Sequence, residues 1–134
     1  ICKYEEIIMA DNDQWRDKLT EEEYRVTRLA GTERPFSGTL LYESRSGSYV
    51  CKCCGVKLFD DTTKFESGCG WPSFFSQSED DNVGYRFDES HGMRRTEIYC
   101  KNCDAHLGHV FSDGPAPTGQ RYCVNSVSLD FNPE

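Results

Sequence analysis

Cysteine is the residue type with the most chemical information in this chain, because eight cysteines occur among 134 residues. Four of them form two Cys-x-x-Cys pairs, Cys51/Cys54 and Cys100/Cys103. Two such pairs predict one tetrahedral Zn²⁺ bound by four thiolates, with iron in the same ligands as the alternative. Because four thiolates leave no open coordination position, we expect the zinc to be structural rather than catalytic.

The other cysteines are not spaced like metal ligands: Cys2, Cys53, Cys69 and Cys123. Cys53 interrupts the first pair, but only Cys51/Cys54 matches the spacing of the second pair, so we interpret Cys53 as a spectator thiol. The alternative is a secreted scaffold with its cysteines in disulfides. It is disfavoured because the chain is not very small and paired Cys-x-x-Cys turns are typical of zinc sites. We therefore expect a reducing compartment.

The segment Arg121-Tyr122-Cys123-Val124-Asn125 brings a thiol close to groups that could tune its reactivity. Residues two apart share a face of a strand, so Arg121, Cys123 and Asn125 are expected to line up together. A neighbouring cation favours the thiolate, which is the reactive form of cysteine. The alternative interpretation is that Cys123 is a small buried hydrophobe.

Two of the three histidines, His106 and His109, lie close to each other in the chain. The turn-rich stretch 113–119 predicts a hairpin that pairs His109 with about Cys123. His109 would then be within reach of the thiol as a proton carrier. His106 would face the other side of a regular strand, unless a bulge at Gly108 turns it round.

A further thiol lies in the segment Gly68-Cys69-Gly70-Trp71-Pro72. Cys69 stands between two glycines, on a loop that could move to bring it to a second sulfur. Trp71 is followed by proline and is therefore rigidly presented. We interpret it as an apolar wall of a pocket, with core packing as the alternative.

The N-terminal part of the chain is expected to be helical over about 13–31. Asp13 is expected to cap a first short helix. Thr20 and Glu23 have the spacing of a capping box for a second helix, which would run to Gly31.

The region from about 36 to 131 is expected to form the β core. Short runs rich in Val, Tyr, Phe and Thr alternate there with turn residues, which predicts antiparallel sheet. The expected strands are Ser48–Cys51, Lys57–Phe59, Tyr85–Phe87, Thr96–Cys100, His109–Phe111 and Arg121–Phe131. The length of the chain predicts a single domain over 1–134.

Charge and hydropathy exclude two classes of partner. The net charge of −8 repels phosphate backbones and anionic lipid, so we expect no nucleic-acid partner. No apolar run approaches the roughly 20 residues that cross a bilayer, so we expect no membrane partner. We expect a monomer in the cytoplasm. An organelle remains an alternative, because the sequence begins at Ile1 rather than Met and a targeting segment is expected to have been trimmed.

Several strings of this sequence resemble those of the methionine-R-sulfoxide reductases, the B-type peptide-methionine sulfoxide reductases. They are Gly68–Phe74, Ser90–Met93, Cys103–Phe111 and Arg121–Ser126. Together with the paired Cys-x-x-Cys turns they are highly specific, and the resemblance extends from about Trp15 to Phe131.

The resemblance implies a mainly β fold with two antiparallel β-sheets, short N-terminal helices and a structural four-cysteine zinc site remote from the active site. It implies that Cys123 is the nucleophile and Cys69 the resolving cysteine. The residues implied around the thiol and the sulfoxide oxygen are His106, His109, Asp113, Asn125 and Arg121. Within this set, Asp113 would orient a histidine and Arg121 would hold the thiolate. The residues implied to contact the methyl group of the substrate are Trp71 and Phe111.

The implied activity is reduction of the R epimer of methionine sulfoxide in oxidised proteins, a reaction of protein repair and antioxidant defence. Cys123 would attack the sulfoxide sulfur while His109 or His106 protonates the oxygen. Cys69 would convert the resulting sulfenic acid into a disulfide, which thioredoxin or a similar dithiol protein would reduce.

Two other function classes are weighed against this one. A non-enzymatic zinc module that binds protein partners would carry the same Cys-x-x-Cys turns, but it has no need of a nucleophile beside histidines. A general thiol-disulfide oxidoreductase would place its reactive cysteines in one Cys-x-x-Cys motif near a βαβ unit, and no such pattern is present.

Overall fold

The structure of the protein, a computed structural model, describes residues 15–134, so the predicted cap Asp13 and the N-terminal Cys2 lie outside the described residues. Residues 15–18 are helical, and the helix α2 follows at Glu21–Thr27. The predicted capping box is confirmed. The Thr20 hydroxyl accepts the N–H of Glu23 at 3.2 Å, and the Glu23 carboxylate accepts the N–H of Thr20 at 2.9 Å.

The prediction that the second helix runs to Gly31 is wrong by one turn, because α2 ends at Thr27. Arg28 caps the helix, and Ala30 has a left-handed φ of 56°, so the chain has already turned away before it reaches the glycine. The N–H of Gly31 then donates to the carbonyl of Arg25 at 3.0 Å, which satisfies an otherwise unpaired carbonyl at the helix end.

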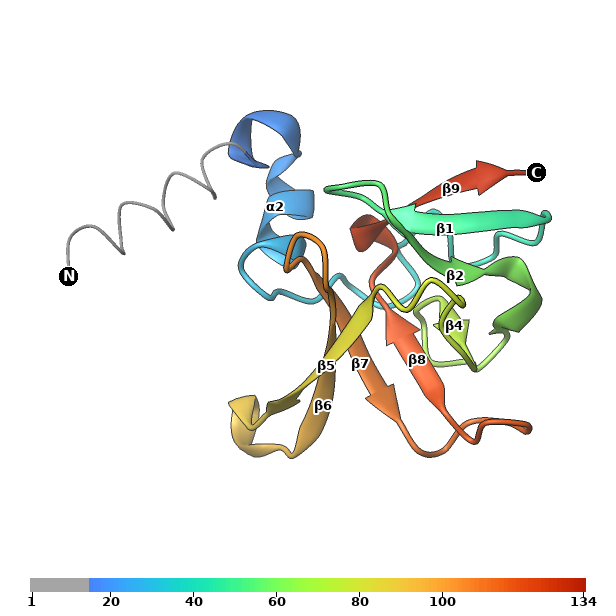
Figure 1. Cartoon of the computed structure of the whole chain (residues 1–134). Helices are drawn as coiled ribbons and strands as arrows, with labels where there is room; N and C mark the ends of the chain where they lie inside the picture. Colours follow the sequence, from blue (N-terminus) through green and yellow to red (C-terminus); the bar gives the residue numbers. More distant parts are fainter. Residues whose placement is uncertain (1–14) are drawn as a thin grey trace.

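The first of two antiparallel sheets has three strands in the order β2-β1-β9 (Figure 1). Their bounds are Gly47–Cys51 for β1, Lys57–Asp60 for β2 and Leu129–Pro133 for β9. In Figure 1 this sheet lies at the upper right, where the chain ends, and α2 lies at the upper left. Two separate β-sheets with short N-terminal helices confirm the predicted fold class.

The second sheet has six strands in the order β3-β4-β8-β7-β6-β5. Their bounds are Lys64–Phe65 for β3, Ser73–Phe74 for β4, Val83–Asp88 for β5, Arg95–Cys100 for β6, His106–Phe111 for β7 and Arg121–Val124 for β8. Single 3₁₀ turns cover Asp61–Thr63, Ser90–Gly92 and Ser126–Ser128. The strands β3 and β4 were not predicted, because two residues are too few to show an alternating pattern.

The expected continuous strand Arg121–Phe131 is wrong, because the 3₁₀ turn at Ser126–Ser128 divides it. Its two halves belong to different sheets, β8 to the six-stranded sheet and β9 to the three-stranded one. Polar side chains at the break bind distant backbone groups. The Asn125 side-chain carbonyl accepts the N–H of Glu33 at 2.9 Å, and the Ser126 hydroxyl accepts the N–H of Leu40 at 2.9 Å. These contacts draw the chain out of the strand and toward the N-terminal loop.

Aromatic side chains join the two sheets. Tyr49 of β1, Phe59 of β2 and Phe74 of β4 are fully buried. The rings of Phe59 and Phe74 stack with their centroids 4.3 Å apart, and Tyr49 meets Phe74 edge-on at 5.0 Å. Each such ring buries a large apolar area, so this contact holds β4 of the second sheet against the first. Across residues 15–134, no helix has the length and apolar character needed to span a membrane.

Candidate functional site

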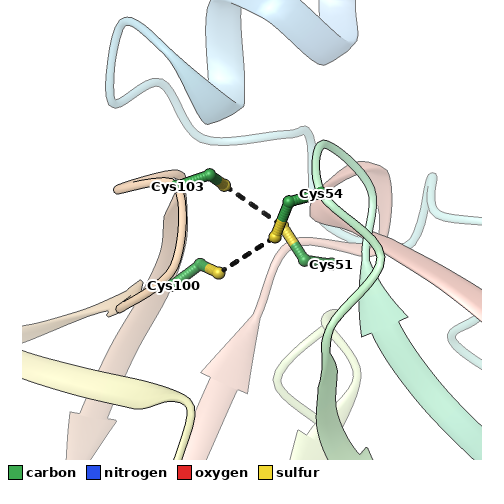
Figure 2. Close-up of side chains that lie close together, drawn as sticks. All are labelled: Cys51, Cys54, Cys100 and Cys103. Carbon is green, nitrogen blue, oxygen red and sulfur yellow. Dashed lines mark hydrogen bonds between the residues drawn. The ribbon is translucent and has the colours of Figure 1, made fainter.

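The two Cys-x-x-Cys pairs meet between the sheets. Cys51 ends β1 and Cys54 lies in the turn that follows it. Cys100 ends β6 and Cys103 lies in the turn that follows that strand, as Figure 2 shows. The Sγ atoms of Cys51 and Cys103 are 3.6 Å apart, and those of Cys54 and Cys100 are 3.5 Å apart. All four sulfurs lie within 4.8 Å of one another. The cluster therefore bridges a turn of the three-stranded sheet and a turn of the six-stranded sheet.

The sulfur positions fit a tetrahedral metal ion. Sulfurs about 2.3 Å from a central Zn²⁺ are roughly 3.8 Å apart along a tetrahedron edge, close to the two shortest separations. Gly55 and Asp104 follow the two pairs with φ of 85° and 68°, as expected for sharp turns. Cys53 is 1% exposed and is not one of the four clustered sulfurs. The cluster is a site that could hold a metal ion.

A second pair of sulfurs lies in the six-stranded sheet. The Sγ atom of Cys123, on β8, is 3.4 Å from the Sγ atom of Cys69, on the loop before β4. The strand β4 pairs with β8 so that Ser73 lies opposite Cys123. Four residues after Cys69, the chain is therefore already fixed in the sheet beside Cys123. The loop thiol predicted to approach a second sulfur stands next to it without further movement.

Both histidines lie beside this thiol pair. His109 of β7 is paired with Cys123 of β8 in the antiparallel register, which confirms the predicted hairpin. The pairing of β6 with β7 shifts by one residue between Gly108 and His106, as a bulge would shift it. The bulge brings His106 to the face of His109, and their ring centroids are 5.6 Å apart.

Each histidine ring is held by a carboxylate that the sequence analysis did not identify. Asp88 Oδ2 lies 2.7 Å from His109 Nε2, and Glu97 Oε2 lies 2.7 Å from His106 Nδ1. The expectation that Asp113 orients a histidine is not met. The Asp113 carboxylate is 66% exposed and instead pairs with a guanidinium, that of Arg121, at 2.9 Å.

A register argument could have found Glu97. The second Cys-x-x-Cys turn joins β6 to β7, and in the resulting hairpin Glu97 lies directly opposite His109. With the bulge at Gly108, the side chain of Glu97 shares a face with both histidines. Asp88 has no comparable local signal, because it belongs to the next strand outward, β5.

The pKa values of the two thiols differ in direction. Burial raises the pKa of Cys123 well above its usual range, and the opposing effect of Arg121 is smaller. The expected effect of Arg121, which favours the thiolate, is therefore present but outweighed by burial. Burial also raises the pKa of Cys69, but hydrogen bonds from Ser67 and Ser73 outweigh it and lower the pKa to about 7. Burial lowers the pKa of His109 and Asp88 opposes this effect only in part, so burial favours the neutral ring.

These side chains surround a pocket of about 270 Å³. Its lining includes Cys69, Cys123, Trp71, His109, Phe111, Arg121 and Asn125, together with Thr32 and Arg95, which the sequence analysis missed. His106 and Asp113 lie outside this lining. His106 instead lines an adjoining hollow, which also includes His109 and Arg95.

The pocket walls are held by direct contacts. Trp71 Nε1 donates to the carbonyl of Glu33 at 3.0 Å, and the N–H of Glu33 donates to the side chain of Asn125. The Asn125 amide N–H₂ donates to the carbonyl of Leu107 at 3.0 Å. The Arg121 guanidinium lies 4.5 Å from the centroid of the Phe111 ring. Indole, amide and guanidinium are thus each fixed in the folded chain before a substrate enters.

A thiol pair in a pocket with histidine, arginine and aromatic walls, separate from a cluster of four cysteines, is typical of thiol-dependent oxidoreductases. The comparison with known families identifies the kind of oxidoreductase. A family model described as the SelR domain matches residues 19–133.

Similar relatives share most of their length with this chain. The peptide methionine sulfoxide reductase MsrB of Alteromonas mediterranea is 64% identical over 126 residues, which are 94% of this chain and 88% of the relative. The protein of the same name from Pseudomonas putida (strain W619) is 60% identical over 121 residues, covering 90% and 91% of the two chains. The chain belongs to the MsrB family of peptide methionine sulfoxide reductases and is an enzyme of that activity.

Proposed function

We propose that this enzyme reduces the R epimer of methionine sulfoxide in oxidised proteins, with Cys123 as nucleophile and Cys69 as resolving cysteine. The observation that carries the proposal is the 3.4 Å separation of their Sγ atoms inside a pocket with His109. Protein repair and antioxidant defence follow from this activity, because methionine sulfoxide is a reversible oxidation product.

The first step transfers oxygen from the substrate to Cys123. The Cys123 sulfur attacks the sulfoxide sulfur, and the thiol proton passes to the sulfoxide oxygen. The transient bond between the two sulfurs and the sulfur–oxygen bond of the substrate then break as the oxygen bonds to the Cys123 sulfur, which leaves methionine and the sulfenic acid of Cys123. The substrate sulfur gains the two electrons that the Cys123 sulfur loses. The proton lost by the thiol equals the proton that the oxygen needs, so a neutral His109 suffices to carry it from one to the other.

The carboxylates and the remaining polar residues support this proton transfer. Asp88 holds His109 in one orientation, and Glu97 holds His106 on the same face of the sheet. Arg121, fixed by Asp113, presents its positive charge near Cys123 and stabilises the thiolate as it develops. We assign Asn125 to ordering the wall beside Cys123.

Substrate selection is assigned to the two aromatic residues of the pocket. Trp71 and Phe111 offer apolar surface to the methyl group of the substrate, while the polar donors face the sulfoxide oxygen. Because a sulfoxide sulfur is a stereocentre, only one epimer can direct its methyl group to the aromatic wall and its oxygen to His109 at the same time. This argument supports a single-epimer enzyme, and the family resemblance favours the R epimer.

In the second step Cys69 attacks the Cys123 sulfenic acid, forms the disulfide and releases water. A dithiol protein such as thioredoxin then reduces the disulfide by thiol–disulfide exchange. We propose that the enzyme works as a monomer with a single domain. We also propose a reducing compartment, with the cytoplasm favoured over an organelle, because the proposed metal ligands and the catalytic pair need to be reduced thiols.

We assign the cluster of Cys51, Cys54, Cys100 and Cys103 to one structural Zn²⁺. The closed set of four thiolates would give the ion a stabilising role, since it leaves no position for substrate. The cluster links turns of two different sheets, which is where a cross-link restrains the fold most.

The test uses the separate R and S epimers of an N-blocked methionine sulfoxide with dithiothreitol as reductant, and product is quantified by chromatography. We expect turnover of the R epimer only. Turnover of the S epimer without the R epimer would refute the proposal. With thioredoxin as reductant, Cys69→Ser should complete one round of reduction per enzyme and then stop, and sustained turnover would show that Cys69 is not the sole resolving residue.

A further inference from the structure

The sulfur of Cys69 lies among hydroxyl groups that the reaction described above does not use. Ser67 Oγ donates a hydrogen bond to Cys69 Sγ at 2.9 Å, and Ser73 Oγ lies 3.4 Å from the same sulfur. The two hydroxyl oxygens are 2.7 Å from each other. Cys69 Sγ is therefore in contact with both serine hydroxyls and with the Cys123 sulfur.

The direction of these hydrogen bonds suits a sulfur that accepts hydrogen bonds. Ser67 Oγ accepts the N–H of Cys69 at 3.3 Å and donates its own proton to Cys69 Sγ. The single proton of the Ser73 hydroxyl has three acceptors within reach: Cys69 Sγ, Ser67 Oγ and the carbonyl of Trp71 at 3.1 Å. As a thiol, Cys69 donates a hydrogen bond to the carbonyl oxygen of Trp71, 3.5 Å away. As a thiolate, it keeps the Ser67 hydroxyl as a donor without any rearrangement of the loop.

The two serines are held by different parts of the fold. Ser73 is 1% exposed and lies on β4, directly opposite Cys123 of β8. Ser67 lies on the loop, and Gly68 after it has a φ of 75°, which turns the chain so that the Ser67 hydroxyl meets the residue two positions later. Ser73 thus supplies a fixed point in the sheet, and Ser67 links the loop to it.

We propose that Ser67 and Ser73 are positioning residues for the resolving step, which hold the Cys69 sulfur as a hydrogen-bond acceptor within reach of Cys123. The inference rests on the proposed role of Cys69. In that step the Cys69 thiolate forms the S–S bond, the S–O bond of the Cys123 sulfenic acid breaks, and hydroxide leaves and takes up a proton to give water. Stabilised thiolate is the species this step consumes, and the low pKa of Cys69 agrees with the assignment.

The test measures the pH dependence of Cys69 alkylation by iodoacetamide in a Cys123→Ser background, with the modified peptide quantified by mass spectrometry. In this background we expect Ser67→Ala and Ser73→Ala to move the midpoint upward, toward the ordinary thiol value of about 8.5. The rate near pH 7 should fall by roughly threefold, because a more basic thiolate is scarcer but more nucleophilic.

Two control variants separate this role from a purely structural one. Ser67→Thr keeps the hydroxyl and should keep the parent midpoint. Ser76→Ala removes a nearby hydroxyl that donates only to the carbonyl of Gln77 among the contacts described, and it should leave the midpoint unchanged. Midpoints equal to the parent value in both Ser67→Ala and Ser73→Ala would overturn the proposal.

A second measurement follows the resolving step itself. This measurement uses protein that retains both Cys69 and Cys123, mixed with one equivalent of methionine-R-sulfoxide. Ser67→Ala should release methionine at the parent rate but form the disulfide more slowly. An unchanged rate of disulfide formation would count against the serines. The alkylation result does not depend on the role of Cys69 in turnover. Sustained thioredoxin-driven turnover of Cys69→Ser would therefore refute the proposed resolving role of Cys69, while the alkylation midpoints would still test the serine contacts.

Discussion

The two groups of cysteines have nearly the same sulfur spacing in very different surroundings. The four-cysteine cluster has Sγ–Sγ contacts of 3.5 and 3.6 Å, and the Cys69–Cys123 pair has one of 3.4 Å. In the cluster, Cys51 and Cys100 are no more than 1% exposed, Cys54 and Cys103 are half-buried, and each pair spans a backbone turn. In the pair, both sulfurs line a pocket of about 270 Å³.

This difference teaches that sulfur spacing alone does not decide what cysteines do. The cluster sulfurs face one another, which suits a shared ion and leaves no side open to a substrate. The pair has a pocket on one side, hydroxyl donors at Cys69 and a charged guanidinium near Cys123. Access and proton donors separate the two groups, and the following predictions test that separation from the largest effect to the smallest.

The largest expected effect concerns the Cys69–Cys123 pair. Cys123→Ser should lower kcat/KM for methionine-R-sulfoxide by at least about 10³-fold, because the serine hydroxyl is a far weaker nucleophile than a thiolate. Zinc content and the melting temperature should stay close to those of the parent protein. The readouts are epimer-resolved chromatography, metal analysis and thermal unfolding. Activity within tenfold of the parent would show that Cys123 is not the nucleophile.

A change in the four-cysteine cluster should instead affect metal content and stability. Cys100→Ser should release the metal and lower the melting temperature by roughly 10 °C or more, because a structural zinc site contributes several kcal/mol to folding. Metal removal from the parent by a strong chelator should have a similar effect. Thermal unfolding and metal analysis measure both. If Cys100→Ser kept the melting temperature but no longer reduced methionine sulfoxide, catalysis would be assigned to the cluster.

The proton pathway predicts a smaller effect within the pocket. His109→Asn should lower kcat by about 10²-fold, the usual contribution of a positioned proton carrier. Asp88→Asn should cost roughly tenfold, because it leaves the ring in place but no longer orients it through a charged partner. Single-turnover kinetics at several pH values separate the two variants. Equal losses would indicate that Asp88 takes part in the proton transfer directly.

The smallest expected effect is on stability in acid. Burial raises the pKa of Glu97, but hydrogen bonds with His106 and Arg86 outweigh it and lower the pKa to about 2. Because the folded pKa lies below the unfolded value of about 4.3, this carboxylate stabilises the fold above that pH and loses the contribution as the pH falls toward 2.

Glu97→Gln should therefore lose about 1–2 kcal/mol of stability at neutral pH, a value reduced for solvent screening, and less at low pH. Denaturant unfolding between pH 6 and pH 3 measures the difference. Parent and variant share the same cysteine cluster, so acid release of metal affects both and cancels in the comparison. A difference that stays constant over this range would exclude the proposed ion pairs as its cause.

Much of the fold and of the site could be predicted from local patterns. The capping box of Thr20 and Glu23 is a contact between residues three apart, and it was predicted correctly. The turn-rich stretch after β7 predicted the pairing of His109 with Cys123, because the two strands are neighbours in sequence and the ends of the connection between them set the approximate register. The break between β8 and β9 was missed, because it depends on bonds from Asn125 and Ser126 to a loop about 90 residues away in sequence.

By itself, the sequence determined which cysteines pair in turns, where a hairpin forms and which family the motifs resemble, since all of these depend on short spacings along the chain. The tertiary structure decided which side chains from separate strands meet. It joined Asp88 to His109, turned His106 through the bulge at Gly108, and placed Ser73 beside Cys69 and opposite Cys123. Strand order, bulges and packing of two sheets set such contacts, and these are cooperative properties of the whole fold that no local pattern contains.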